Sequence, residues 1–385
     1  MIRILPFSVV RALVLGACVA TALVAQQQPL PTWRLDSTPG LVIEEDGRPE
    51  TEFLRIAGAW RVEGGRIAIA NSASSEIRLF SPTGRLERTV GRQGSGPGEF
   101  QLILWGGRSV DTLFLYDPML RRLTTVDLSG EARVVGTLRI VAQGGRESFE
   151  ILGRLAGGQW LAKSTSHVGW DAPPGVHRKR DDIGVVRASG DGQVRWVADV
   201  LGMASFVFNP SGRIQEALLG PIAFSPWALT VASGGSLWYG ESGKPEIMRY
   251  DPASARLQRI RLPLQMRQPS RELISSARAE EAQTDRRANR AFMDAKYSTR
   301  YLPTALPYFE DLIAADDGAI WVREYVGIRS APASHLVIDR TGRLRARVAV
   351  PGGMRVTDIG RDYILGVYRN ADGVESVRLY GLTRN

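Results

Sequence analysis

Residues able to carry chemistry are few in this chain of 385 residues. Histidine occurs only as His167, His177 and His335, and their spacing fits no common zinc-binding pattern. The single cysteine, Cys18, precludes an internal disulfide. No Gly-x-Ser-x-Gly sequence is present, so a nucleophile elbow is not supported. Three carboxylates lie on, or at the start of, predicted inner strands, and these are Glu310, Asp311 and Asp358.

The elements that would position these side chains are short strands. Beyond residue 30, apolar and polar residues alternate, first at 66–70 and 76–80, and after a turn at 86–90. Similar units recur further along the chain, and units of about 40–50 residues with four strands each are typical of a β-propeller. We predict six blades, near residues 53–90, 100–140, 149–200, 221–264, 308–350 and 354–380.

The last predicted blade contains only three clear strands. A strand without a partner lies near the start of the chain, at 33–35 or 41–43. Pairing this strand with the last blade would close the ring and remove its open edge. The predicted fold class is therefore all-β, a six-bladed β-propeller closed by an N-terminal strand, with a helical insertion between blades four and five.

One stretch resembles a known repeat. Residues 69–80, the turn at 82–84 and the glycine-rich segment 91–100 resemble the NHL-type repeat, and the chain is similar to secreted bacterial NHL-repeat and TolB-like propeller proteins. Asn71 stands where the repeat usually has Asp. No helix follows Gly94–Gly98, so these glycines predict a tight crossing between blades and not a phosphate-binding loop.

The resemblance to six-bladed propellers implies an alternative function. Relatives with gluconolactonase-like activity hold one calcium ion in the channel through Glu, Asn and Asp residues from different blades. Glu310, Asp311 and Asp358 would supply oxygen ligands here, since carboxylates suit calcium. No matching Asn lies on a predicted inner strand. The other interpretation is that Glu310 and Asp311 are solvated rim charges or cap neighbouring backbone.

Long excursions from the predicted blades share one face of the ring. They comprise 167–182, 201–220 with a hairpin at 206–214, and 269–302. The last has no Gly or Pro from 270 to 301 and predicts helices that begin after an N-cap at Ser270. It forms either a solvated helical hairpin or a lid or docking helix. Loops on one side of a scaffold commonly carry recognition, so this face is the predicted working surface.

Aromatic residues divide into two groups. Trp160, Trp238 and Trp321 recur at equivalent second-strand positions, which indicates packing between blades. Trp170 lies outside this pattern and is a candidate ligand contact. The predicted ligand- or partner-binding residues are Trp170, Asp171, His177, Arg178, Phe206, Phe208, Arg286 and Arg290.

The N-terminal 25 residues predict export. Arg3 and Arg11 precede or border an uncharged stretch over 12–25, which is the layout of a secretory signal peptide. Residues 15–18, Leu-Gly-Ala-Cys, also resemble a bacterial lipobox, which would place a lipid on Cys18. Cleavage after Ala25 and lipidation of Cys18 remain two alternatives. Both place the protein in the periplasm, in the medium or on the cell envelope.

Charge does not indicate a nucleic-acid partner. Lys and Arg number 49 against 40 Asp and Glu, but only four are lysines and the arginines are scattered. The ordinary composition excludes a disordered or fibrous chain. We therefore expect an exported scaffold without intrinsic catalysis that binds a protein or carbohydrate and needs no cofactor. The alternative is a calcium-dependent hydrolase or lyase. A membrane contact is expected only through a lipid on Cys18.

Overall fold

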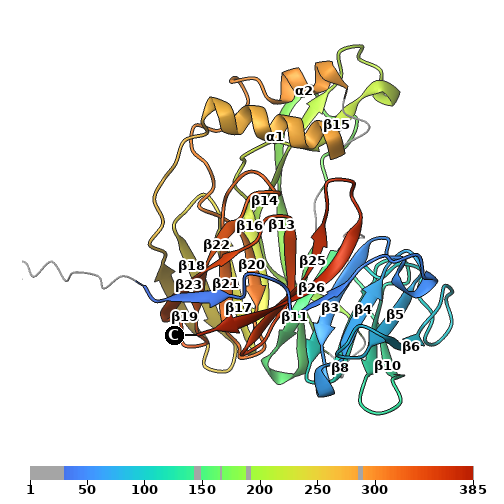
Figure 1. The fold of residues 1–385 in the computed structure, drawn as a ribbon. Coiled ribbons are helices and arrows are strands. Elements are labelled where there is room, and N and C mark those ends of the chain that lie inside the picture. The colour runs from blue at the N-terminus through green and yellow to red at the C-terminus, as the bar shows by residue number, and fades with distance from the viewer. Residues whose placement is uncertain (1–29, 143–148, 165–166, 188–191, 285–288, 385) are drawn as a thin grey trace, which may run out of the picture.

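The chain folds into small, mostly antiparallel β-sheets (Figure 1). This computed structural model describes residues 30–142, 149–164, 167–187, 192–284 and 289–384. The predicted signal peptide at 1–25, with Cys18, lies outside the described residues. Within the described ranges, no helix has the length and apolar character needed to cross a membrane.

Four sheets follow one another along the chain. The first contains β3 (Ile56–Arg61), β4 (Ile67–Asn71), β5 (Glu76–Phe80) and β6 (Leu86–Val90). The second contains β7 (Trp105–Ser109), β8 (Thr112–Asp117), β9 (Arg122–Asp127) and β10 (Arg133–Arg139). The third contains β11 (Phe149–Leu155), β12 (Gln159–Ser164), β13 (Gly175–Arg187), β14 (Val194–Phe208) and β15 (Leu218–Pro221). The fourth contains β16 (Ala228–Ser233), β17 (Ser236–Glu241), β18 (Glu246–Asp251) and β19 (Arg256–Arg261).

The remaining strands belong to one larger sheet that includes the start of the described chain. Its members are β20 (Phe309–Ala314), β21 (Ile320–Glu324), β22 (Ala333–Ile338), β23 (Leu344–Val350), β24 (Met354–Ile359), β25 (Tyr363–Arg369), β26 (Glu375–Thr383), β1 (Thr32–Leu35) and β2 (Leu41–Ile43). β1 pairs in parallel with β23 and antiparallel with β26, while β2 also pairs with β26. The N-terminal segment therefore joins the last two groups of strands.

The first strand of each group lies next to the first strand of the following group. β3 contacts β7, and the contacts continue through β11, β16, β20 and β24 back to β3. The four separate sheets all pair their strands in simple sequence order, as expected from strands joined by hairpins. This arrangement places the first strands around a common centre, and the fold is all-β and propeller-like.

The recurring tryptophans pack between neighbouring sheets, as their spacing predicted. Trp160 on β12 lies 4.7 Å from Phe114 of the preceding sheet, measured between ring centroids. Trp238 on β17 shares a buried cluster with Phe309 of β20. Each large ring is thereby buried between two neighbouring sheets, which neither sheet could achieve alone.

Two helices and a long hairpin extend from one end of the sheets (Figure 1). The helices are α1 (Arg271–Thr284) and α2 (Arg290–Lys296), and the Ser270 hydroxyl accepts the predicted capping hydrogen bond from the Leu273 N–H at 3.1 Å. The loops predicted at 167–182 and 201–220 are partly wrong. β13 begins at Gly175, inside the first, and β14 continues to Phe208, inside the second, because the two segments pair with each other over a long register.

The glycine-rich segment forms a turn, as predicted. Gly94 and Gly98 have positive φ angles of 155° and 76°. The backbone N–H of Gly96 donates to the Glu99 carboxylate at 2.8 Å, so this donor is already used within the turn. The segment therefore shapes the connection between the first two sheets.

Candidate functional site

The two helices and the ends of β13, β14 and β15 form one packed unit, which we term the helix-bearing face. Phe206 is 2% exposed and lies 4.9 Å from Tyr301 and 6.0 Å from Phe292, between ring centroids. Phe208 lies 6.1 Å from Phe292 on α2. Segments distant in sequence thus share a hydrophobic core of their own.

Hydrogen bonds fix the helix-bearing face to the sheets. The Glu280 carboxylate on α1 accepts from the backbone N–H groups of Arg329 and Ser330 at 2.9 and 3.0 Å. Arg178 on β13 donates to the Pro226 carbonyl and the Ser225 hydroxyl, both at 2.5 Å. These contacts come from different elements, so they restrict the orientation of the whole unit.

A buried cation joins the two helices. Lys296 on α2 is 1% exposed and forms an ion pair with Glu281 on α1. The Tyr297 hydroxyl donates to the same carboxylate at 2.8 Å. Burial, followed by the hydrogen bond to Glu281, raises the pKa of Tyr297 well above its usual value, so this hydroxyl stays protonated and remains a donor.

Four of the predicted binding residues are exposed on or beside this face, and one of them, Arg178, also donates the hydrogen bonds described above. Trp170 is 50% exposed in the turn before β13, and Asp171 is also exposed. The Arg290 side chain is 93% exposed, at 3.8 Å from the Asp294 carboxylate. His177 is partly exposed, and its Nε2 atom lies 2.6 Å from the Pro173 carbonyl oxygen. Arg286 lies outside the described residues.

Two other predicted binding residues, Phe206 and Phe208, belong to the internal packing of the same unit, and the exposed Arg178 ties the unit to the sheets. Phe206 and Phe208 lie beneath α2, so a partner could reach Phe206 only if the helix moved. Arg178 uses its guanidinium on the hydrogen bonds described above. These three side chains are therefore placed to hold the helix-bearing face together.

Apolar side chains that the sequence analysis did not select are exposed on the same hairpin. Val176 on β13 is 42% exposed, and Met203 on β14 is 48% exposed. Trp170, before β13, and Ile214, between β14 and β15, are exposed as well. The signal was present in the sequence as apolar residues within the predicted excursions, but only the strand pairing shows which of them remain uncovered.

Two of the candidate carboxylates lie at the start of β20. The pairing of β20 with β21 shifts register between Phe309 and Asp311, and Glu310 occupies this irregularity. Glu310 Oε1 lies 2.9 Å from Arg323 Nε, yet burial raises the pKa of Glu310 to about 7. Burial also raises the pKa of Asp311, whose Oδ1 accepts from the Leu312 N–H at 2.8 Å. Glu310 could therefore exchange a proton near neutral pH.

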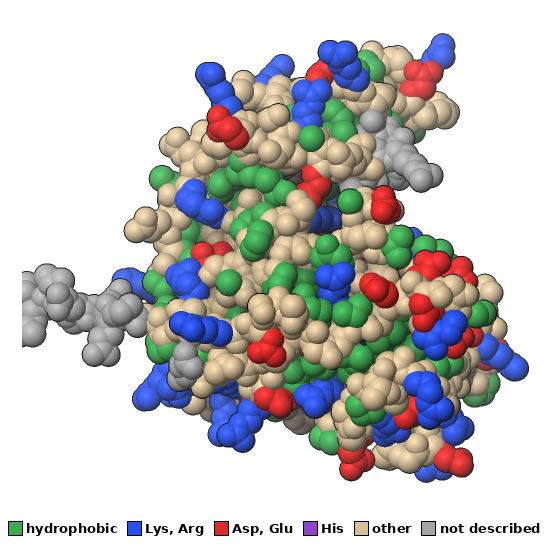
Figure 2. Space-filling model, viewed as in Figure 1, with side chains coloured by type: hydrophobic (Ala, Val, Ile, Leu, Met, Phe, Trp, Pro, Cys, Tyr) green, Lys and Arg blue, Asp and Glu red, His purple; other side chains and the backbone are tan. Residues whose placement is uncertain are grey.

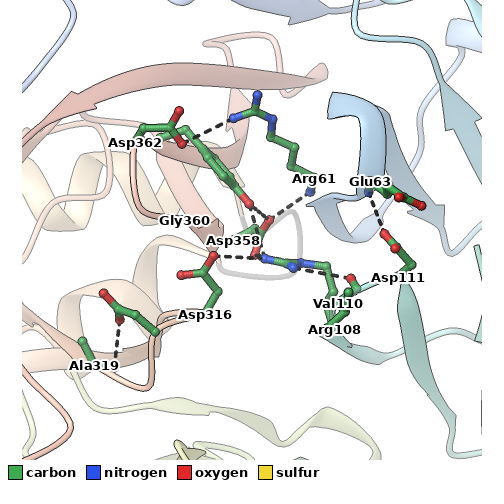
Figure 3. A network of polar contacts seen from close by, with 12 residues as sticks. Arg61, Glu63, Arg108, Val110, Asp111, Asp316, Ala319, Asp358, Gly360 and Asp362 are labelled. Atoms are coloured by element: carbon green, nitrogen blue, oxygen red, sulfur yellow. Dashed lines mark hydrogen bonds and ion pairs between the residues drawn. The ribbon is translucent and has the colours of Figure 1, made fainter. Parts of the chain in front are cut away.

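Asp358 lies in a different network, shown in Figure 3. Its carboxylate accepts hydrogen bonds from the Arg61 backbone N–H at 2.9 Å, the Tyr363 hydroxyl at 2.7 Å and Arg108 Nη2 at 2.9 Å. Asp316 lies 3.8 Å from the same guanidinium nitrogen of Arg108. Both Asp358 oxygens thus have protein donors, and the network connects several first strands at the centre of the molecule.

The described residues do not bring the three candidate carboxylates together in one cluster. Among the described residues, no group of three His, Cys, Asp or Glu side chains is arranged to hold a metal ion. Glu310 pairs with Arg323, whereas Asp358 pairs with Arg108. Because donors from three other residues surround Asp358, its oxygens are poorly placed to bind a cation as well.

Comparison with known proteins adds information on the fold alone. No family model matches the sequence, and no curated protein matches it. A DUF4221-family member from Bacteroides vulgatus is similar in structure, with a TM-score of 0.52 and 9% sequence identity over 92% of this chain and 100% of that chain. This likeness agrees with the arrangement of small antiparallel sheets described above.

Two further solved structures show weaker likeness. Regucalcin from Agrobacterium tumefaciens, described as a calcium-binding protein, has a TM-score of 0.41 and 11% identity over 92% of this chain and 97% of its own. A virginiamycin B lyase from Staphylococcus aureus has a TM-score of 0.40 and 10% identity over 89% of this chain and 98% of its own. The order of the sheets and the contacts between their first strands define the class, which is a propeller-like all-β protein.

Proposed function

We propose that this chain is an exported six-bladed β-propeller that binds a protein partner through its helix-bearing face and has no intrinsic catalysis. The cyclic contacts of the six first strands support six blades. The pairing of β1 and β2 with the last strands supports closure of the ring by the N-terminal segment. Residues 26–385 then form one domain, with 269–302 inserted between blades four and five.

The observation that carries this proposal is the helix-bearing face itself. Its elements have their own hydrophobic core, and hydrogen bonds from Glu280 and Arg178 hold it in place. It nevertheless leaves Trp170, Val176 and Met203 exposed. A fixed surface with uncovered apolar and aromatic side chains suits protein recognition.

The arrangement of carboxylates gives less support to a calcium-dependent hydrolase or lyase. Such an enzyme would use Glu310, Asp311 and Asp358 together, but Asp358 belongs to a separate network with Arg108 and Tyr363. The Glu310 pKa of about 7 has a simpler physical cause, which is burial beside a single arginine. We therefore assign the two groups to the interior of a binding scaffold.

Export to the periplasm or the medium belongs to the same proposal. It depends on the charged start, the apolar stretch at 12–25 and the small residues around Ala25. The lipobox-like sequence ending at Cys18 would instead attach the protein to the cell envelope. We propose neither a nucleic-acid partner nor a cofactor for this protein.

A capture experiment with matched surface variants tests the proposed partner. The first variant combines Trp170→Ala, Val176→Ser and Met203→Ser. The control changes Leu104, Val110 and Met119 to Ser, which are 48%, 74% and 66% exposed on the second sheet or its borders. We expect the first variant to lose a protein that copurifies with the wild type and the control to retain it. Retention by both variants, or loss by the control alone, would contradict the assignment.

A further inference from the structure

Arginine side chains gather on the outer surface around β19 and the turn before β23. Figure 2 shows Lys and Arg side chains over the region where Figure 1 labels β19 and β23. We term this region the arginine face, and its exposed members are Arg256, Arg259, Arg261, Arg340, Arg343 and Arg345. A Cβ atom at Gly342 would lie only 2.5 Å from Gln258 Nε2, so the turn rests directly against β19. The two sets of arginines therefore form one surface.

Few carboxylates form ion pairs with the arginine face, although Asp251 and Glu246 on β18 lie opposite two of its arginines in the strand pairing. Arg345 lies 2.6 Å from Asp339, and Arg259 lies 3.9 Å from Glu246. Within the described part of the chain, four of its arginines have no carboxylate within 4.0 Å; they are Arg256, Arg261, Arg340 and Arg343. β19 carries three arginines and no acidic residue, whereas another strand of the chain, β6, carries Glu87 beside its single arginine, Arg88.

The described chain begins at the edge of this same surface. The backbone N–H of Arg347 on β23 donates to the Pro31 carbonyl at 2.9 Å. Leu30 packs in a cluster with Leu264, which follows β19, and with Leu344 on β23. The 29 residues before Leu30 include the apolar stretch 12–25 and Cys18. Any membrane attachment through that segment would bring the arginine face close to the bilayer.

We propose that the arginine face binds the surface of an anionic phospholipid bilayer. Guanidinium groups stay charged at every physiological pH and match the phosphate oxygens of lipid headgroups. Several exposed arginines act together at such a surface, and salt weakens the attraction. In Figure 1 the labels of α1 and α2 lie well apart from β19, so this orientation would leave the helix-bearing face free. The inference does not depend on the proposed function of that face.

Vesicle cosedimentation tests the proposal. Every described element lies within residues 26–385, so this segment, which lacks both the apolar stretch and Cys18, is mixed with vesicles of phosphatidylglycerol and phosphatidylcholine at low salt. The test variant combines Arg256→Glu, Arg261→Glu and Arg343→Glu. A control with the same change in charge combines Arg85→Glu, Arg88→Glu and Arg133→Glu, which are exposed on other sheets or their turns. Thermal unfolding of each variant verifies that it is folded.

The proposal predicts binding to the anionic vesicles that decreases with added salt and little binding to phosphatidylcholine alone. The test variant should partition into the anionic vesicles at least about tenfold less than the wild type, and the control should change by less than about threefold. Equal losses in the two variants would overturn the proposal, because only net charge would then matter. Absence of wild-type binding, or equal binding to neutral vesicles, would overturn it as well.

Discussion

Arg108 Nη2 donates a hydrogen bond to the Asp358 carboxylate at 2.9 Å, although the two residues are 250 positions apart in the sequence. The contact joins β24 to β7 (Figure 3). β3 contacts both of these strands, and the backbone N–H of Arg61 at its end donates to the same carboxylate. One carboxylate thereby connects three neighbouring first strands, β3, β7 and β24. Two of these, β3 and β24, belong to the first and the last group of strands.

Removing the charge of Asp358 should destabilise the fold. Asp358→Asn leaves the Arg108 side chain, which is 12% exposed, without its closest carboxylate. Loss of one partner from a buried pair should lower the free energy of unfolding by about 3 kcal/mol. Urea unfolding measures this change in the free energy of unfolding. The control Glu216→Gln disrupts an ion pair whose side chains are 75% and 52% exposed, and it should change the free energy of unfolding by about 0.5 kcal/mol or less. Equal effects would show that Asp358 does not stabilise the contacts between the first strands.

Stability should depend on pH through Glu310. Its pKa rises from 4.5 to about 7 on folding, so between these values the folded protein binds a proton that the unfolded chain releases. The contribution of Glu310 to the free energy of unfolding is therefore largest below pH 4.5 and is lost as pH rises through 7.

The variant Glu310→Gln isolates this effect. Between pH 5 and pH 8, the wild type should lose up to about 3 kcal/mol of stability relative to the variant. Urea unfolding of both proteins at the two pH values gives this difference. A difference independent of pH would show that Glu310 does not titrate in this range when folded.

The buried lysine should hold the two helices together. Lys296→Met removes the cation that pairs with Glu281 between α1 and α2. We expect amide hydrogens in both helices to exchange at least about tenfold faster, while amides in the central strands change little. Hydrogen exchange measured by mass spectrometry distinguishes these regions. Arg290→Met, at a side chain that is 93% exposed, is the control. Unchanged exchange in Lys296→Met would exclude this role.

Local patterns predicted the strands and helices because their causes are local. Alternation over 66–70 and 76–80 corresponds to β4 and β5, and Ser270 caps α1 as expected. The extent of β13 and β14 was missed because it depends on pairing between two segments that each read as loops.

The partners of the candidate site residues could not be predicted in the same way. Phe206 was selected as a surface contact, but Phe292, some 86 positions later in the chain, covers it. Asp358 was selected as a metal ligand, but Arg108 and Arg61 come from strands near the other end of the sequence. In both cases packing between segments far apart in the sequence determines the neighbour, and no periodicity in the sequence records it.

Calcium should leave the stability unchanged. A single site filled at a hundred times its dissociation constant would add about 2.7 kcal/mol to the free energy of unfolding. Because Asp358 is occupied by Arg108 and Tyr363, we expect the same melting temperature for residues 26–385 in excess calcium and in chelator. A rise with calcium would favour the hydrolase alternative and direct mutagenesis to Glu310 and Asp311.

Site-specific photo-crosslinking in the cells that produce the protein tests partner binding by the helix-bearing face most directly. A photoreactive phenylalanine derivative replaces Trp170, and in a control it replaces Val110, which is 74% exposed in the turn between β7 and β8. We expect a discrete adduct of higher mass from position 170 and none from position 110. An adduct from position 110 alone, or no adduct from position 170, would contradict partner binding by the helix-bearing face.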